Sequence, residues 1–410
     1  MRLFNHRISL FEILLIVNLL HDIPAVGFYM PGAIFSAVVV FTFVAGFLQI
    51  NRFGTYVFSP SIKMMGVFIL TFIYICVNHS YSPAIAFYQF LQSLVYPIIG
   101  FYLLSKRDIG LTKVFFLVLA LTYILTSITT AIGCQQYPLA ARELTGNQED
   151  SIAYALYKTK NIGDFHFVYF LTISMPLVIG LIKHGYIKKY IGYVIVALFL
   201  ATIYYSAYTT ALLLSVMSAA LLFIGKDLNS GNTNRIVTLF VVFAILGSSL
   251  LPALLDLLSS LAGTDDVSSR LADINSYMNN QDIDEDGDMS IRLDKFSKSF
   301  NAFLNNPIIG SWGNPHVGGH SYFLDTMGDF GFIGIAALVI MYRKIINTVI
   351  IPFKNYSWYG YIAMTFTLSI MQAAINPNPS LKVLIVAIPV FVLLMLEKDE
   401  ENSFSTYSSI

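Results

Sequence analysis

The stretch IFSAVVVFTFVAGFLQI, from Ile34 to Ile50, contains no charged residue. A second uncharged stretch runs from Ile191 to Ser206. Helices and strands of water-soluble domains alternate apolar and polar positions, whereas uninterrupted apolar runs of this length are typical of helices that cross a lipid bilayer. Both stretches therefore predict membrane-spanning helices.

The composition of the whole chain agrees with this interpretation. Apolar residues make up 56% of the 410 residues and charged residues only 12%, against roughly 25% charged residues in an average soluble domain. Lys plus Arg and Asp plus Glu number 24 each, so the net charge indicates neither an acidic nor a basic partner, and no nucleic acid is expected. Two cysteines are too few for a disulfide framework.

Apolar windows of about 17 to 25 residues predict an all-α, polytopic membrane protein with about twelve transmembrane helices in a single domain, residues 1–410. The segment from Ile191 to Gly225 is too long for one span, because 35 residues would measure about 52 Å against a hydrocarbon core of about 30 Å. A hairpin that turns near Ala207 and Tyr208 is expected instead. The expected spans are residues 8–23, 30–50, 64–79, 84–104, 112–133, 165–182, 191–206, 209–225, 236–258, 321–341, 356–375 and 382–396.

The basic residues predict the orientation. With the N-terminus in the cytoplasm, sixteen of the 24 Lys and Arg residues lie on the inner side, as the positive-inside rule requires. Both termini are then cytoplasmic, residues 397–410 form a disordered cytoplasmic tail, and two long loops, 134–164 and 259–320, face outward. Apolar residues at helical spacing, such as Leu293, Phe296 and Phe300, predict short amphipathic helices in the second loop.

The segment Asn305–Gly334, NNPIIGSWGNPHVGGHSYFLDTMGDFGFIG, is the most informative part of these loops. It places His320 where a span begins, and the unsatisfied amides and partial positive charge of a helix N-terminus attract anions and hold an imidazole neutral. A neutral imidazole is the form that a general base needs, although a structural helix-capping role is the alternative. His316, in the same turn, is a weaker candidate.

Carboxylates and glycines follow in the same span. Asp325 lies in the first helical turn and suits the helix dipole, whereas Asp329 lies deeper and needs a partner. Gly328, Gly331 and Gly334 recur at every third position, which predicts close packing of another helix.

Cationic side chains in the outer loops are candidates for binding an anionic lipid head group. Guanidinium groups bind phosphate oxygens bidentately, which favours Arg142, Arg270 and Arg292, with Lys160 as a weaker candidate. Each of them could instead form an ordinary loop salt bridge. No metal or other cofactor is expected: the acidic segment Asp282–Asp288 begins like a calcium loop but has Leu293 where that loop needs Glu, and no His and Cys residues have zinc spacing.

Several of these motifs together resemble the O-antigen polymerase (Wzy) and O-antigen ligase superfamily, especially polymerases of capsule or exopolysaccharide repeat units. They are Ala141–Leu144, Asn161–Phe165, Arg292, Asn306–Gly310, Gly318–Ser321, Leu324–Asp325 and Gly328–Gly331. The number of spans and the positions of the two outer loops extend the resemblance over nearly the whole chain.

The resemblance implies a metal-independent glycosyltransferase in the bacterial plasma (inner) membrane. The donor would be a growing glycan on undecaprenyl pyrophosphate, and the acceptor a single lipid-linked repeat unit. His320 matches the histidine that deprotonates the attacking sugar hydroxyl, and Arg142 and Arg292 match arginines that hold pyrophosphate, with Arg270 a less certain match. A chain-length regulator, a flippase and membrane lipids would be partners.

One departure separates the chain from this family. Many members of that family carry a Ser-Arg pair in the hairpin where this chain has Ser206–Thr210, so either its pyrophosphate clamp is built otherwise or its substrate is held differently. The alternatives are an O-antigen ligase, which transfers finished glycan to lipid A core, and a non-catalytic lipid-glycan transporter. Transporters usually show paired halves and broken, charged spans near the membrane midplane, and neither is evident in the sequence.

Overall fold

The structure of the 410-residue chain is a computed structural model. It describes residues 2–3, 6–21, 26, 30–78, 83–137, 140–143, 161–225, 228, 231–242, 288–313, 316–377 and 380–407. Within these ranges the regular structure is helical, apart from one short antiparallel pairing near the N-terminus in which Arg2 faces Arg7 and Leu3 faces His6.

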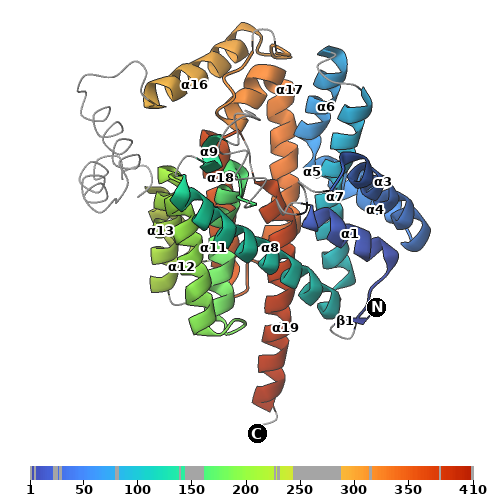
Figure 1. Ribbon diagram of the computed structural model, residues 1–410, viewed down its shortest axis with the longest axis vertical. Helices are drawn as coiled ribbons and strands as arrows, with labels where there is room; N and C mark the ends of the chain where they lie inside the picture. Colours follow the sequence, from blue (N-terminus) through green and yellow to red (C-terminus); the bar gives the residue numbers. More distant parts are fainter. Residues whose placement is uncertain are drawn as a thin grey trace.

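Figure 1 labels the elements in chain order. They are β1 (Arg2–Leu3), β2 (His6–Arg7), α1 (Leu10–Leu20), α3 (Gly32–Gln49), α4 (Phe53–Tyr56), η1 (Val57–Ser61), α5 (Ile62–Met64), α6 (Gly66–Asn78), α7 (Pro83–Lys106), α8 (Ile109–Gln136), α9 (Ala140–Glu143), α11 (Phe165–Lys183), α12 (Lys189–Tyr205), α13 (Thr209–Ile224), α16 (Asp288–Asn305), α17 (Tyr322–Ile345), η3 (Ile346–Ile350), η4 (Ile351–Phe353), α18 (Tyr359–Ile375), η5 (Val383–Ala387) and α19 (Ile388–Tyr407).

Five helical segments of the described chain are long and apolar enough to cross a membrane. They are α3, the Phe87–Lys106 part of α7, α8, α11 and the segment Tyr322–Phe353 that begins with α17. Five shorter apolar helices are α1, α6, α12, α13 and α18. Each expected span overlaps a helix of the described ranges, and of the ninth, 236–258, only residues 236–242 lie within those ranges.

The expected hairpin is confirmed at the end of α12. That helix ends at Tyr205 and α13 begins at Thr209. At the turn Ala207 adopts a φ of 55°, and the Ser206 hydroxyl donates a hydrogen bond to the Thr202 carbonyl at 2.7 Å. The two helices are thereby antiparallel neighbours.

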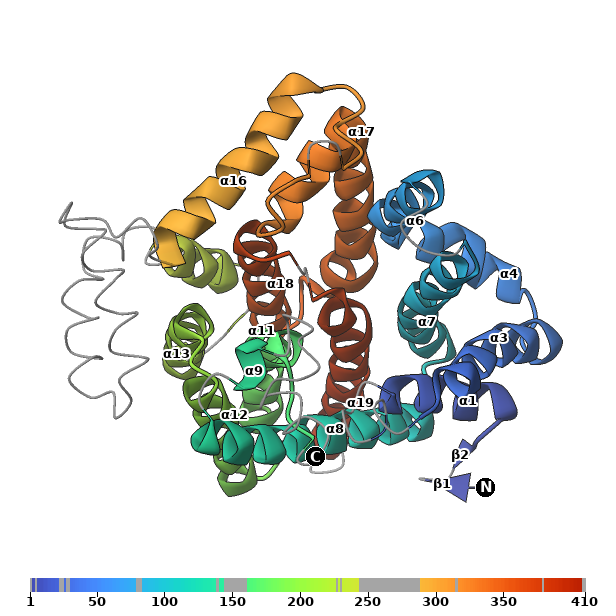
Figure 2. The same cartoon turned by 45° about the horizontal axis from the view of Figure 1, so that its top comes forward.

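Helix α11 lies at the centre of one half of the bundle and is buried over nearly its whole length. It packs against α12, α13 and α18, while α1, α3, α6 and α7 form the other half. Figure 2 shows α8 running across one edge of the molecule from α1 to α12, passing α19. Amphipathic α16 lies at the top of Figure 1 against α17, and the C-terminus lies at the bottom.

One expectation about these elements is wrong, and another needs a refinement. Residues 397–407 are not a disordered tail, because α19 continues through them to Tyr407. Glu397 and Asp399, at the start of this extension, bind Lys113 and Trp358, which gives this part of the helix partners on the bundle. The expected span 321–341 falls within the candidate span Tyr322–Phe353, but Gly331, with a φ of 58° and a ψ of −143°, divides α17 into two parts.

Candidate active site

The loop between α16 and α17 carries the candidate residues, and glycines shape it. Gly310, Gly313 and Gly319 adopt φ values of 78°, 76° and 71°, a region that favours glycine. A side chain on Gly318 would collide with the Lys295 carbonyl of α16. The loop therefore lies directly on α16, and glycine is what allows this close contact.

Asp325 fixes the end of this loop at the start of α17. Its carboxylate accepts hydrogen bonds from the Ser299 hydroxyl at 2.6 Å, from the Gly319 amide at 3.1 Å and from the Ser321 amide at 3.0 Å. The Ser299 hydroxyl in turn accepts from the Gly318 amide at 2.9 Å. Asp325 thus joins α16, the loop and α17, and its role is structural.

His320 immediately precedes the N-cap residue of α17. The N-cap is Ser321, whose hydroxyl accepts from the Leu324 amide at 3.2 Å. The His320 ring is half-buried, and its Nδ1 lies 3.0 Å from the carbonyl oxygen of Gly319. A carbonyl only accepts hydrogen bonds, so this contact favours the tautomer with hydrogen on Nδ1 and the basic lone pair on Nε2.

The loop also supplies hydrogen-bond partners for α17 at Gly331, where the helix is interrupted. The amides of Ser311 and Trp312 donate to the carbonyls of Gly328 and Asp329 at 2.8 and 3.0 Å. The Phe332 amide donates to the Pro307 carbonyl at 2.8 Å. Backbone groups that a continuous helix would pair internally are thereby satisfied by residues 307–312.

The expectation that all three glycines of α17 receive another helix is only partly correct. Gly328 does lie against α16, where an added Cβ would be 2.8 Å from the Ser299 carbonyl oxygen. Gly331 instead faces Pro307 and Gly310 of the loop, and Gly334 faces Thr326 within α17 itself. These last two glycines permit the bend in α17.

The structure describes only some of the predicted site residues besides His320. Arg292 lies half-buried on α16, and His316 lies exposed in the loop, close enough to Asp329 for an electrostatic interaction. Arg142 belongs to α9, but its side chain lies outside the described part of the structure. Arg270 and Lys160 also lie outside the described residues.

Helix α9 is held against the α12–α13 hairpin. Ala140 and Ala141 are fully buried, and the Tyr208 hydroxyl donates to the Ala141 carbonyl at 3.3 Å. The backbone of Arg142, the next residue, therefore lies close to the turn between α12 and α13.

An apolar cavity of about 80 Å³ lies elsewhere, between α8, α11, α12 and α19. Its lining includes Tyr123, Leu177, Phe199 and Phe391 and none of the candidate residues. Within the described ranges, no group of three or more His, Cys, Asp and Glu side chains could hold a metal ion. Neither feature adds to the His320 site.

Helix α18 carries a set of polar residues that the predicted site does not include. Thr365, Ser369, Gln372 and Asn376 follow one another at intervals of four, three and four residues, and all four are buried. This spacing puts them on one face of a helix. Their helical spacing within the expected span 356–375 is the sequence signal for this face, although the high apolar content of the span obscures it.

These features together define an α-helical membrane protein in which a glycine-rich loop presents a histidine at the N-terminus of a helix. Comparisons of the chain with protein-family models, with curated proteins and with solved structures give no match.

Proposed function

We propose that the chain is a polysaccharide polymerase of the bacterial plasma membrane, with about twelve spans, cytoplasmic termini and an active site on the outer face. It would transfer a growing undecaprenyl-pyrophosphate-linked glycan onto a lipid-linked repeat unit. The observation that carries the proposal is the position of His320: its ring lies directly before the N-cap residue of α17, with Nδ1 3.0 Å from the Gly319 carbonyl oxygen.

In this mechanism Nε2 of His320 accepts the proton of the acceptor sugar hydroxyl. The hydroxyl oxygen forms a bond to the anomeric carbon of the donor, and the bond from that carbon to the pyrophosphate oxygen breaks. The electron pair leaves with undecaprenyl pyrophosphate, whose charge Arg292 on neighbouring α16 would stabilise. Arg142, beside the hairpin turn, would take the place of the arginine that Ser206–Thr210 lacks.

Replacement of the proposed base tests the proposal. Purified protein incubated with one defined lipid-linked repeat unit should form polymer, and His320→Ala should lose at least about a hundredfold of this activity, the usual contribution of a general base. His184→Gln is the matched histidine control, because His184 is the C-cap residue of α11 and is not part of the candidate site. This variant should retain polymer formation at neutral pH. An unchanged chain-length ladder for His320→Ala would exclude the catalytic role.

The orientation is tested separately. A single cysteine at position 320 should react with a membrane-impermeant maleimide added from outside intact spheroplasts. Labelling only after the membrane is opened would place this residue in the cytosol and end the proposal.

The broken α17 supports a second candidate, a lipid-glycan transporter, because discontinuous helices line the sites of many transporters. Here the carbonyls at the break are paired with the Ser311 and Trp312 amides, so the break is closed by protein instead of being open to a ligand. This pairing favours the enzyme. Movement of the lipid-linked repeat across proteoliposomes without polymer formation would favour the transporter.

A further inference from the structure

Helix α16 carries a row of exposed apolar side chains. Leu293, Phe300 and Leu304 are 39%, 45% and 56% exposed, and their separations of seven and four residues place them on one face of the helix. The neighbouring face, with Ser299 and Ala302, is buried. The remaining face is polar and exposed, with Asp294, Ser297, Lys298, Asn301 and Asn305. Helix α16 therefore has one side on the protein, one polar side, and one apolar side that is exposed.

The apolar row continues beyond the end of α16. Ile308 and Ile309 in the following loop are exposed, and so is Phe332, the first residue after the bend in α17. The rings of Phe303 and Phe332 are in contact, with a centroid distance of 5.6 Å, which joins the two helices at this point. We call this set of exposed residues the apolar strip; it consists of Leu293, Phe300, Leu304, Ile308, Ile309 and Phe332.

The strip leads directly onto an exposed apolar side of α17. Val339 follows Phe332 by seven residues and Ile340 follows Ile333 by seven, so these four exposed side chains share one side of the helix. They belong to the segment Tyr322–Phe353, which is long and apolar enough to cross a membrane. Apolar side chains that are exposed on a membrane span face the hydrocarbon chains of the lipid. The apolar strip is therefore continuous with a surface that meets lipid.

We propose that α16 lies in the membrane interface on the side of the bilayer that carries His320, with the apolar strip against the lipid chains and the polar face among the head groups. Helix α16 is strongly amphipathic but not hydrophobic on average. This combination is typical of helices that lie in an interface with their apolar side about 5 to 10 Å deep. Figures 1 and 2 show α16 along one edge of the molecule, where lipid can reach it. The inference requires a membrane protein and not the polymerase activity.

The position of α16 determines the height of the candidate active site relative to the bilayer. The Ser299 hydroxyl of α16 donates to the Asp325 carboxylate and accepts from the Gly318 amide. His320 lies between these two residues in the chain. A helix held at a fixed depth in the interface therefore keeps the histidine at the level of the lipid head groups.

Photoreactive lipid tests the inference in the unmodified full-length protein. The protein in nanodiscs that contain a phospholipid with a diazirine in its acyl chain would be irradiated, and the modified residues would be mapped by mass spectrometry. We expect modification within the apolar strip, at Phe300 and Leu304 above all, and none at Asn301. Phe41 of α3, exposed on another candidate span, is the positive control, and the fully buried Ile173 of α11 is the negative control.

Spin labels measure the orientation of α16. In a background with Cys76→Ala and Cys134→Ala, Leu304→Cys and Asn301→Cys would each carry one nitroxide label. The label at position 304 should be more accessible to oxygen, which dissolves in lipid, than to a water-soluble nickel complex, and this order should reverse at position 301. Adding Phe300→Asp should shift the label at position 304 toward the nickel complex, whereas the matched charge Asn301→Asp, on the polar face, should leave it unchanged.

Each outcome gives a decision. An apolar strip that stays unmodified while Phe41 is modified would overturn the inference. So would a label at position 304 that neither oxygen nor nickel reaches, because a second copy or another protein would then cover the strip. If the cysteine-free background fails to fold, the photoreactive lipid decides alone. A protein whose strip is modified by lipid but that makes no polymer would retain this interface and lose the proposed polymerase function.

Discussion

Three hydrogen bonds converge on Asp325, and they make this carboxylate the structural centre of the loop. In Asp325→Asn one oxygen becomes an NH₂ donor that faces an amide donor, so at least one bond is lost. We expect a loss of unfolding free energy of about 1 to 3 kcal/mol in thermal denaturation. Asp294→Asn is the control, because Asp294 forms only an exposed ion pair with Lys298 and its loss should change stability by less than about 1 kcal/mol.

Arg292 is expected to act through the geometry of its guanidinium group. Lysine keeps the charge but has no planar fork for a pyrophosphate. We therefore expect Arg292→Ala to raise the KM for the lipid-pyrophosphate substrate about ten- to a hundredfold, and Arg292→Lys to raise it less. Lys298→Ala, an exposed position on the same helix, should leave the KM unchanged. Equal activity of the two Arg292 variants would contradict this role.

At the scale of single residues, the sequence predicted some positions and not their contacts. The placement of His320 directly before a helix was predictable, because a glycine-rich turn precedes an apolar run. The partners of Asp325 were not, since Ser299 belongs to another helix and becomes a neighbour only when α16 folds onto the loop. The polar face of α18 was missed because an apolar average hides four polar residues at helical spacing.

At the scale of elements, the break in α17 depends on Gly331. Its backbone angles lie in a region that is almost exclusive to glycine, and an added Cβ would be 2.5 Å from the Pro307 carbonyl oxygen. Gly331→Ala should therefore lower stability by at least about 1 to 3 kcal/mol and release loop 307–312, with faster amide exchange at Ser311 and Trp312.

Gly32→Ala is the matched control for that prediction. Gly32 is the first residue of α3 and has open space around its Cα. Alanine there should keep or slightly raise stability, since it reduces the freedom of the unfolded chain. If both alanine variants melted like the wild type, the conclusion that the bend in α17 requires glycine at position 331 would be wrong.

The helices themselves were largely predictable, and their interruptions were not. A long apolar run forms a helix in the membrane whichever helices pack against it. The helices α3, α8 and α11 therefore lie where the hydropathy pattern predicts them. Glycine at every third position is compatible with both close helix packing and a bend. The outcome in α17 depends on loop 307–312, whose amides pair with the helix carbonyls, and that pairing is a tertiary event.

At the scale of the whole molecule, a cluster of polar groups joins the ends of α11, α18 and α19. The Trp358 indole donates to the Asp399 carboxylate at 2.9 Å, and the His184 ring packs edge-on against Tyr361. Burial lowers the pKa of His184 below its ordinary value, and Lys183 lowers it further, against an opposing effect of Asp399. The stability of this cluster at the C-terminal end of α11 should therefore depend on the protonation of His184.

The sign of the pH effect follows from that depressed pKa. Between the folded-state pKa and the ordinary value near 6.5, the unfolded chain binds a proton that the folded chain does not, so stability falls as the pH falls through this window. The melting temperature should decrease between about pH 7.5 and 5.5, and this decrease should be smaller in His184→Gln. An identical pH profile in both proteins would contradict the assignment.

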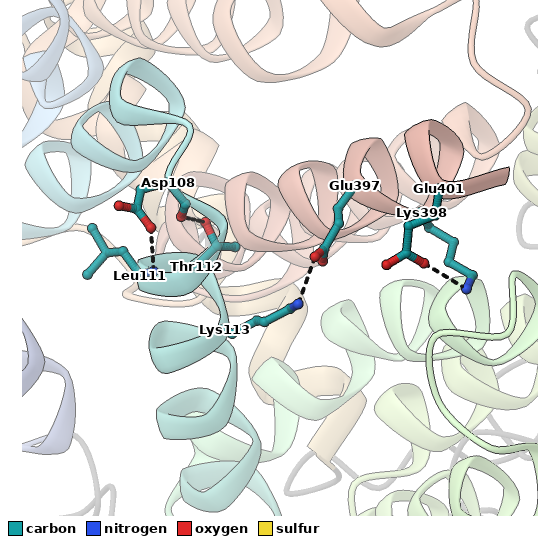
Figure 3. Close-up of polar contacts among 7 residues, drawn as sticks. All are labelled: Asp108, Leu111, Thr112, Lys113, Glu397, Lys398 and Glu401. Atoms are coloured by element: carbon teal, nitrogen blue, oxygen red, sulfur yellow. Dashed lines mark hydrogen bonds and ion pairs between the residues drawn. The ribbon is translucent and has the colours of Figure 1, made fainter. Parts of the chain in front are cut away.

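The C-terminal part of α19 holds the same end together and gives the test of whether residues 397–407 are a structural part of the molecule. Figure 3 shows Glu397 bound to Lys113 of α8, at 2.7 Å. A chain that stops after Leu396 loses this ion pair and the Asp399 bond to Trp358, and should be less stable by roughly 2 to 4 kcal/mol, since hydrogen bonds to charged groups contribute about 1.5 to 3 kcal/mol. A chain that stops after Asn402 keeps both contacts and should melt like the full-length protein. If the two truncations melted at one temperature, these contacts would not stabilise the bundle, and the segment would behave as the free tail that its charged sequence first indicated.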